Sequence, residues 1–293
     1  MTTLDPRVAR TFLFVPGHRA DRFDRAYASG AAAVIIDLED AVAPQDKGSA
    51  RTHAARWLAA AGPRALVRVN AVGTKWFTDD VAILAPLAAG IVLPKTERAD
   101  DVAAVHDAAG TVLDVVGLVE SARGLAHVSE ICGSPGLIRL ALGNVDLAAG
   151  LGIDPGSHLA LQAARSALVY ASAAALLPSP VDGVTTALED EDRLRADSLH
   201  AREMGFGARL CIHPRQLEIV NACLSPTSAE LEWAVSVLAS ATDSVSVHEG
   251  QMIDEPVLLR ARRLLAQAGT DEDPLGGGGQ AEAARLVRKT RRP

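Results

Sequence analysis

Eight short apolar runs recur along the chain, each followed by a segment of helical length rich in Ala and Leu. Within a run the apolar residues are continuous rather than alternating, which indicates strands buried on both faces, as in a parallel sheet covered by helices. The runs span residues 11–15, 33–37, 65–69, 90–93, 114–119, 138–142, 181–184 and 208–212. Eight strand–helix units favour a closed (β/α)8 TIM barrel. The alternative, a doubly wound sheet, needs a switch point in strand order, and no sequence feature marks one.

Three further segments have the pattern of helices. Residues 159–177 are rich in Ala and Leu, and Pro178 should end that helix because proline cannot continue one. Residues 227–242 open with residues typical of a helix start, and residues 250–265 are typical of a turn and a final helix. We therefore predict extra helices at the C-terminal side of the barrel.

The last part of the chain has a different composition. After Gly269 come an acidic triplet, four consecutive glycines and a basic end, which is typical of a flexible segment. The sequence therefore predicts one barrel domain over residues 1–269 and a flexible C-terminal tail over residues 270–293.

Composition excludes several classes of protein. Of the 293 residues, 48% are apolar, which suffices for a large core. The net charge of −7 argues against a surface for nucleic acid or anionic membranes. No uncharged stretch is long enough for a membrane helix, and the N-terminal apolar run is too short for a signal peptide. Three separated cysteines without a CxxC pair fit a reducing compartment. We therefore expect a cytoplasmic protein that binds neither nucleic acid nor membrane.

Polar residues follow the apolar runs at the points where the strands should end. In a TIM barrel the active site lies at the carboxyl ends of the strands. The residues at these ends are Pro16 and Gly17, Asp37 to Asp40, Arg68 and Asn70, Lys95, Glu120, Asn144 to Asp146, and His213. Their position predicts that they meet at one face of the barrel.

Glu120 and Asp146 follow the fifth and sixth runs, which are neighbours in a barrel. Two carboxylates completed by water and substrate oxygens form a usual Mg²⁺ site. Each acid alone could instead cap the helix that follows it, because acids stabilise helix N-termini. The shared position of the pair favours metal binding, and without a His/Cys cluster Zn²⁺ is disfavoured.

Acids and an arginine at the second and third runs are candidates for substrate chemistry. Asp37, Glu39 and Asp40 concentrate negative charge, and Glu39 is the strongest catalytic candidate among them. Arg68 can bind a substrate carboxylate with its planar fork. A structural salt bridge from Arg68 to these acids is the rival interpretation, and the two are compatible.

Other polar residues have weaker patterns. His213 could be a base, although a structural histidine held by backbone fits as well. Lys95 could form a Schiff base, but that requires a desolvated lysine, and electrostatic pairing suits a charged barrel mouth better. The cysteines lack adjacent bases and are predicted to lie in the core. The glycines at residues 150–152 lack the GxGxxG fingerprint of dinucleotide sites.

An ordered series of motifs over residues 10–265 resembles the citrate lyase β-subunit-like branch of the HpcH/HpaI aldolase superfamily. The motifs are RTFLFVPG from Arg10, IIDLEDAV from Ile35 with Lys47 and Arg51 following, VRVN from Val67, LPK from Leu93, LVESARGL from Leu118, GNVDL from Gly143, CIHPRQ from Cys211 and GQMID from Gly250. The tail lies outside the resemblance. Each motif alone is unspecific, but the series is highly specific.

The resemblance implies a TIM barrel, usually trimeric, that uses Mg²⁺ and acts on CoA or acyl-carrier thioesters and 2-keto acids. It implies that Glu120 and Asp146 bind the metal and that Arg68 binds the keto acid. It places the backbone of Asn144 and Val145 beside the substrate. In CoA-using relatives the aspartate corresponding to Asp254 reaches into a neighbouring subunit as an acid or base.

The chain departs from the family pattern in three places. Asn144 and Val145 replace a common Ala-Glu pair beside the metal, which could alter substrate fit. Ala20 stands where Pro is frequent and Leu224 where Phe is frequent, and neither change touches the chemistry. The resemblance implies a carbon–carbon lyase acting on a 3-hydroxyacyl thioester such as citramalyl-CoA, malyl-CoA or a citryl thioester. Alternatives are a malyl-CoA-type thioesterase, a β subunit that works only inside a citrate lyase complex, and a barrel that binds keto acids without catalysis.

Overall fold

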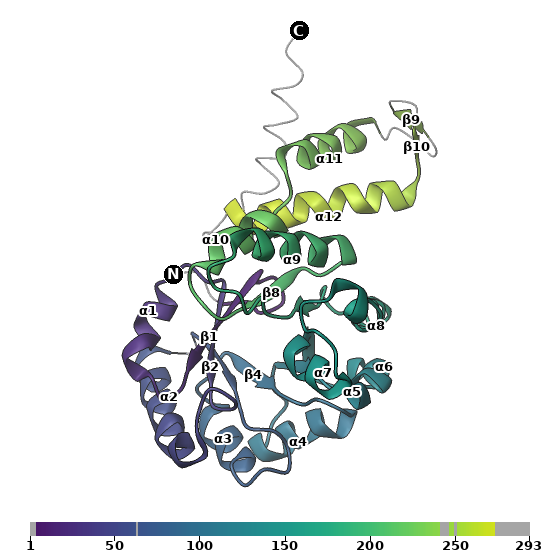
Figure 1. Ribbon diagram of the computed structural model, residues 1–293. Helices are drawn as coiled ribbons and strands as arrows, with labels where there is room; N and C mark the ends of the chain where they lie inside the picture. The colour runs from purple at the N-terminus through teal and green to yellow at the C-terminus, as the bar shows by residue number, and fades with distance from the viewer. Residues whose placement is uncertain (1–3, 63, 241–245, 249–250, 273–293) are drawn as a thin grey trace. The chain divides into compact units, whose positions relative to one another are not determined.

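A computed structural model describes residues 4–62, 64–240, 246–248 and 251–272 (Figure 1). Eight parallel strands close into a barrel in sequence order, with β8 pairing back to β1. They are β1 (Thr11–Pro16), β2 (Ala33–Asp37), β3 (Leu66–Arg68), β4 (Gly90–Leu93), β5 (Val115–Val119), β6 (Leu137–Leu142), β7 (Val181–Asp182) and β8 (Ala208–Cys211). The predicted TIM barrel is confirmed, and each strand overlaps one of the eight apolar runs.

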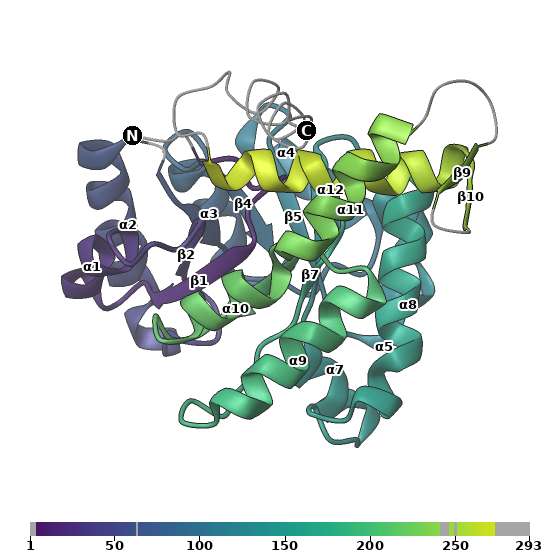
Figure 2. The same ribbon diagram turned by 90° about the horizontal axis from the view of Figure 1, so that it is seen from above.

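Helices connect the strands and surround the barrel. They are η1 (Ala20–Arg22), α1 (Phe23–Tyr27), η2 (Pro44–Asp46), α2 (Lys47–Ala61), α3 (Phe77–Leu84), α4 (Ala99–Ala109), α5 (Ala122–Ala126), α6 (Val128–Cys132), α7 (Asn144–Leu151), α8 (His158–Ala174), α9 (Glu191–Met204) and α10 (Gln216–Leu224). Figure 2 shows α9 and α10 side by side, where α10 covers the seam at which β8 meets β1. Helices therefore cover the outer face of the sheet, as the continuous apolar runs predict.

The strands bury both of their faces, in two separate apolar layers. One layer fills the inside of the barrel and includes Phe12, Ile35 and Leu210. The other lies between the strands and the helices and includes Leu13 and Ile36. Neighbouring residues of one strand thus belong to different layers, because successive side chains of a strand point to opposite faces. Each fully buried side chain of this size stabilises the fold by roughly 1.5–3 kcal/mol.

Several predicted boundaries differ from the structure, and two of them have a local physical reason. Helix α8 ends at Ala174 rather than at residue 177, because Leu176 takes a left-handed conformation with φ of 58° before the prolines are reached. Strand β7 ends at Asp182 rather than at residue 184. The amide of Val184 donates instead to the side chain of Asn144, at 2.9 Å, so a side chain replaces the next strand partner.

The described chain forms two compact units, one ending at Leu224 and the other beginning at Ser225. The second unit contains α11 (Ser228–Ser240), β9 (Ser246–His248), β10 (Gln251–Ile253) and α12 (Glu255–Glu272). Helices α11 and α12 pack around a small apolar cluster that includes Ala234, Val237 and Ala261. The predicted C-terminal helices are confirmed, whereas the antiparallel β9–β10 pair was not predicted.

Helix α12 continues to Glu272, past residue 270 where the tail was predicted to begin. The rest of that predicted tail, residues 273–293, lies outside the described residues. Within the described part of the chain, no helix is long and apolar enough to cross a membrane.

Candidate functional site

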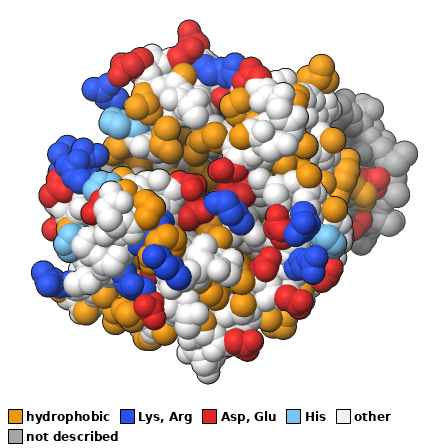
Figure 3. All heavy atoms as spheres, turned by 60° about the horizontal axis from the view of Figure 1, so that its bottom comes forward, with side chains coloured by type: hydrophobic (Ala, Val, Ile, Leu, Met, Phe, Trp, Pro, Cys, Tyr) orange, Lys and Arg blue, Asp and Glu red, His pale blue; other side chains and the backbone are white. Residues whose placement is uncertain are grey.

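Charged side chains from five consecutive strands gather at the carboxyl ends of the barrel. They are Asp37, Glu39 and Asp40 at β2, Arg68 at β3, Lys95 after β4, Glu120 after β5, and Asp146 in the first turn of α7 after β6. We call these seven residues the mouth cluster. Figure 3 shows a face of the molecule on which acidic and basic side chains gather around a central hollow. The sequence prediction that the strand ends carry the polar residues of one site agrees with this arrangement.

Arg68 is held by Asp37 from the adjacent strand, because the pairing of β2 with β3 sets these two residues opposite each other. Nε and Nη2 of Arg68 donate to the two carboxylate oxygens of Asp37, both at 2.7 Å. This is the strong bidentate geometry of an arginine–carboxylate pair. The salt bridge that was the rival interpretation of Arg68 is therefore present. Nη1 is the one nitrogen of the guanidinium group that Asp37 does not engage.

Glu39 is buried, yet it lies between two cations. Nη1 of Arg68 is 3.1 Å from its Oε2, and Nζ of Lys95 donates to its Oε1. Burial raises the pKa of Glu39, and the positive charges of Arg68 and Lys95 oppose that rise. The more exposed Asp40 lies 3.5 Å from Nη1 of Arg68 and 3.9 Å from Nζ of Lys95. The electrostatic pairing predicted for Lys95 is confirmed.

Glu120 is buried at the end of β5 and points across to β4. Its Oε1 accepts a hydrogen bond from the backbone N–H of Lys95 at 2.8 Å. Burial, together with the negative charges of Glu39 and Asp146, raises the pKa of Glu120 to about 8. Gly143, after β6, packs so closely on the Glu120 side chain that a Cβ atom there would collide with the carboxyl group. The neighbouring α5 is capped by Ser121 instead, so the helix-capping role considered for Glu120 is wrong.

The residues of the predicted metal pair fit a divalent cation. Among the described residues, no Lys, Arg or His lies within ion-pair distance of either Glu120 or Asp146. The two acids repel each other, which is part of the reason that the pKa of Glu120 is raised. Both offer hard oxygen ligands, which Mg²⁺ prefers, and Mg²⁺ commonly takes only one or two carboxylates and keeps several waters.

No group of three or more His, Cys, Asp or Glu side chains within the described ranges forms a metal cage. Asp146 lies in the first turn of α7. There its charge also stabilises the helix N-terminus, so the two roles considered for it are compatible.

Asn144 and Val145 begin α7, between Gly143 and Asp146. The side chain of Asn144 is buried and fixes the segment after β7, since its Oδ1 accepts from the N–H of Val184 and its Nδ2 donates to the carbonyl of Val184 at 3.1 Å. Val145 is exposed, with 39% of its surface accessible. The substrate contact predicted for their backbone stays a prediction.

A buried lysine supports the acidic segment after β2. Lys47, in the first turn of α2, donates to the carbonyl oxygens of Leu38 and Glu39, at 2.9 and 3.0 Å, and to Oδ1 of Asn70. Asn70 donates in turn to Asp80. Burial lowers the pKa of Lys47. The sequence analysis placed Lys47 in a motif and Asn70 at a strand end but gave neither a role, because spacing along the chain does not show that both reach the same loop.

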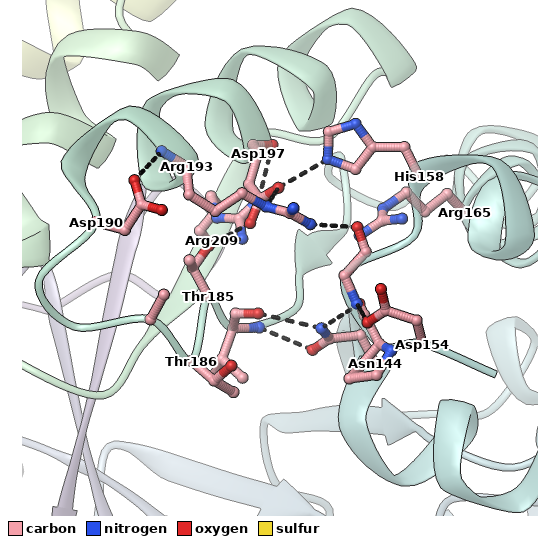
Figure 4. Close-up of a pocket in the computed structure, with 14 residues that line it drawn as sticks. Asn144, Asp154, His158, Arg165, Thr185, Thr186, Asp190, Arg193, Asp197 and Arg209 are labelled. Carbon is pink, nitrogen blue, oxygen red and sulfur yellow. Dashed lines mark hydrogen bonds and ion pairs between the residues drawn. The ribbon is translucent and has the colours of Figure 1, made fainter. Parts of the chain in front are cut away.

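A second set of charges lies outside the barrel wall, between strands β7 and β8 and helices α8 and α9 (Figure 4). We call His158, Arg165, Asp182, Asp197 and Arg209 the wall cluster. Asp182 accepts from Arg165 at 3.0 Å and from Arg209 at 2.9 Å. Asp197 hydrogen bonds with Nε2 of His158 at 2.7 Å. The cluster borders a cavity of about 270 Å³, and its acids already have cationic partners, Asp182 in Arg165 and Arg209 and Asp197 in Arg193.

The remaining predicted residues are His213, the three cysteines and Asp254. Nδ1 of His213 accepts from the backbone N–H of Arg215 at 3.1 Å, as expected for a structural histidine. Cys132, Cys211 and Cys223 are buried free thiols, as predicted for core residues. Asp254 belongs to the second unit, where its Oδ1 accepts from the N–H of Val257 at the start of α12. The catalytic role predicted for Asp254 stays a prediction.

Residues 10–214 match the family model described as HpcH/HpaI aldolase/citrate lyase. The chain belongs to this family. A (3S)-malyl-CoA thioesterase from Cereibacter sphaeroides is 38% identical over 271 residues, which cover 88% of this chain and 94% of that protein. A citrate lyase subunit beta-like protein from Deinococcus radiodurans is 36% identical over 279 residues, covering 89% and 98% of the two chains.

A solved structure has the same fold. The protein CitE from Mycobacterium tuberculosis, solved with magnesium, acetoacetate and coenzyme A, superposes with a TM-score of 0.79 at 34% identity, covering 90% of this chain and 99% of that one. The same protein has also been solved with magnesium and pyruvate. The resemblance predicted from the motifs is confirmed at the level of the family.

Proposed function

We propose that this protein is a Mg²⁺-dependent carbon–carbon lyase that cleaves a 3-hydroxyacyl thioester into an acetyl thioester and a 2-keto acid. The observation that carries the proposal is the acid pair Glu120 and Asp146, which has no basic partner among the described residues and lies in a mouth that also holds Arg68 and Lys95. Citramalyl-CoA, malyl-CoA and a citryl thioester are the candidate substrates. The related CitE structure with magnesium, acetoacetate and coenzyme A supports this class of ligand.

Glu120 and Asp146 would hold the metal. When bound, Mg²⁺ supplies Lewis-acid stabilisation of the substrate's hydroxyl and carboxylate oxygens. A cation bound at this site would displace the proton of Glu120 and lower its raised pKa, because an opposite charge favours the ionised carboxylate. Gly143 leaves the room that the Glu120 side chain needs.

Arg68 would bind the keto-acid part of the substrate through Nη1, the nitrogen that Asp37 leaves unengaged. The bidentate pair with Asp37 fixes the direction of the guanidinium group, and such prior orientation lowers the cost of stabilising charge in the transition state. Burial alone would lower the pKa of Arg68, but the hydrogen bonds and charge of Asp37 raise it, so the group stays cationic. Glu39 remains a proposed catalytic residue whose carboxylate holds Arg68 and Lys95 toward each other.

Cleavage breaks the carbon–carbon bond next to the hydroxyl-bearing carbon. The hydroxyl proton passes to water, that carbon becomes the ketone of the 2-keto acid, and the electron pair of the broken bond passes to the acetyl thioester as its enolate. A proton must then reach the enolate carbon. Following the family resemblance, we assign that step to Asp254 of a neighbouring subunit, and we propose a homotrimer. The exposed apolar side chains of Leu159 and Tyr170 on α8 are compatible with such an assembly.

Thioester hydrolysis is the second candidate, because the malyl-CoA thioesterase relative is 38% identical to this chain. Water would then attack the thioester carbonyl and leave the carbon–carbon bond intact. A third candidate is a subunit that acts only on a carrier-bound thioester inside a citrate lyase complex.

One assay separates these candidates. Purified protein is incubated with Mg²⁺ and, in turn, citramalyl-CoA, malyl-CoA and citryl-CoA, and the products are identified by mass spectrometry. Acetyl-CoA together with pyruvate, glyoxylate or oxaloacetate supports the lyase. Free CoA together with intact malate would contradict the lyase and support the thioesterase. An absence of turnover on every thioester, in protein shown to be folded, would contradict both and favour the carrier-dependent subunit.

A further inference from the structure

The two cations of the mouth cluster differ in how much of their hydrogen-bonding capacity is used. Arg68 is largely enclosed, since its side chain is 10% exposed, Asp37 takes two of its nitrogens, and its Nη1 lies near Glu39. Lys95 is 45% exposed. Within the described part of the chain, its ammonium group donates a hydrogen bond to Glu39. Oδ1 of Asp40 lies 3.9 Å from Nζ of Lys95, beyond hydrogen-bond range. Lys95 is therefore more accessible from the mouth than Arg68 and has fewer protein partners.

The backbone of Lys95 is also unusual. Its φ of 49° is in the left-handed region, which residues with a side chain rarely adopt. In this conformation the N–H of Lys95 donates to Oε1 of Glu120 and the ammonium group donates to Glu39. One residue thus contacts two of the three buried carboxylates of the mouth, Glu120 with its backbone and Glu39 with its side chain.

We propose that Lys95 is a further catalytic residue, whose ammonium group, oriented by Glu39, donates a hydrogen bond to the substrate oxygen that becomes negatively charged during cleavage. The inference rests on the proposed function. As the carbon–carbon bond breaks, its electron pair spreads onto the thioester oxygen to form an enolate, and Lys95 stabilises that oxygen without losing its proton. The hydroxyl proton leaves as described above, so the step needs no oxidant, reductant or further reactant.

In this proposal Arg68 and Lys95 bind different parts of the substrate. Arg68, tied to Asp37 on the β2–β3 side of the mouth, is oriented for the keto-acid part. Lys95 comes from β4 and contacts Glu120 of β5, so it lies on the metal side. Preorganised donors of this kind usually contribute a large part of the stabilisation of an oxyanion.

The test compares three variants with the unaltered protein. Lys95→Met removes the ammonium group and keeps a long side chain with the same backbone requirement. Lys95→Arg keeps a cation, and Lys75→Met is the matched control, because Lys75 is an exposed lysine that lies over Trp76 outside the mouth cluster. For each protein, kcat and KM are measured on whichever thioester is turned over, and Mg²⁺ affinity is measured by calorimetry without substrate.

We expect Lys95→Met to lower kcat by about 10²-fold and Lys95→Arg to restore most of it. Mg²⁺ should bind to Lys95→Met as tightly as to the unaltered protein or several-fold more tightly, because removing a positive charge beside two carboxylates favours a cation. If Lys95 only held Glu120 in place, Lys95→Met would instead lower the affinity for Mg²⁺, because Glu120 would lose its fixed position.

Two results would overturn the role of Lys95: kcat of Lys95→Met within about threefold of the unaltered protein, or a loss of Mg²⁺ affinity that parallels the loss of activity. Neither result touches the proposed function, which fails only if the unaltered protein cleaves no carbon–carbon bond. The Mg²⁺ titration needs no substrate, so the electrostatic part of the inference is tested in either case.

Discussion

The mouth cluster and the wall cluster are built from the same kinds of side chain, but their charges are balanced differently. In the mouth, the five acids Asp37, Glu39, Asp40, Glu120 and Asp146 face the two cations Arg68 and Lys95. In the wall cluster, Asp182 and Asp197 face Arg165, Arg209 and His158, and each acid has a basic partner. A surplus of one sign therefore distinguishes the candidate site from a structural network.

The pKa values report the same difference. Burial and neighbouring acids raise the pKa of Glu120 to about 8. Burial would raise the pKa of Asp197 too, but hydrogen bonds from Thr185 and His158 and the charges of Arg209 and Arg193 bring it below its usual value. A buried acid that lacks a cation gains from a ligand that supplies one, whereas a buried acid that already has a cation contributes to the fold.

The largest predicted effect is that of Glu120→Gln in the mouth cluster. The amide keeps the shape of the side chain and removes its charge, so Mg²⁺ should no longer bind measurably and turnover should fall by at least about 10³-fold. Calorimetry with Mg²⁺ and a steady-state assay check both effects. Mg²⁺ affinity equal to that of the unaltered protein would contradict the ligand assignment.

Arg209→Met in the wall cluster should act on stability instead. Arg209 is 1% exposed and donates to Asp182, to the carbonyl of Asp197 and to Thr185. Breaking a buried ion pair on one side costs about 3–5 kcal/mol, and since Arg165 still pairs with Asp182 we expect a loss near the lower end of that range. Urea unfolding should show a lower free energy of unfolding, while kcat per folded molecule stays unchanged. A loss of kcat in folded protein would mean that the wall cluster takes part in the chemistry.

Arg68→Ala tests whether a residue can serve both a structural pair and the substrate. Loss of one preorganised donor typically costs about 10²–10³-fold in kcat, and we expect a loss of at least that size. Asp37→Asn is the companion variant, since it weakens the bidentate pair while leaving the guanidinium group in place. Near-normal turnover of Arg68→Ala would remove Arg68 from the mechanism and leave only its salt bridge.

The smallest predicted effect concerns pH and the edge of the wall cluster. His200 stacks on His158 with ring centroids 4.0 Å apart. Burial and the charges of His158 and Arg165 lower its pKa. Between the lowered pKa and the usual value the unfolded chain binds more protons than the folded one, so the free energy of unfolding should fall as the pH drops below about 6.5.

His200→Gln should flatten that pH dependence, by no more than about 1 kcal/mol between pH 7 and pH 5. Urea denaturation at the two pH values measures it, with the exposed His18 changed to Gln as the control. An equal slope in His200→Gln and in the unaltered protein would show that other groups determine the acid sensitivity.

Much of the fold could be predicted from the sequence because both layers of the barrel depend on local apolar runs. Ala33–Asp37 and Gly90–Leu93 were placed with their observed ends. The end of β7 was not, because it depends on the side chain of Asn144, which comes from another strand end. The antiparallel pair of β9 and β10 was also missed, because residues 250–265 were interpreted as a turn and a final helix.

By itself the sequence determined the eight strands, the family, and which residue types stand at the strand ends, because these depend on hydrophobic pattern and motif order. The tertiary structure alone decided how the charges pair: that Arg68 binds Asp37 bidentately, that Lys95 contacts both Glu39 and Glu120, and that the acids of the wall cluster are neutralised. The physical reason is that electrostatic interaction depends on distance and burial in space, and residues 25 to 56 positions apart in the chain become neighbours only when the barrel closes.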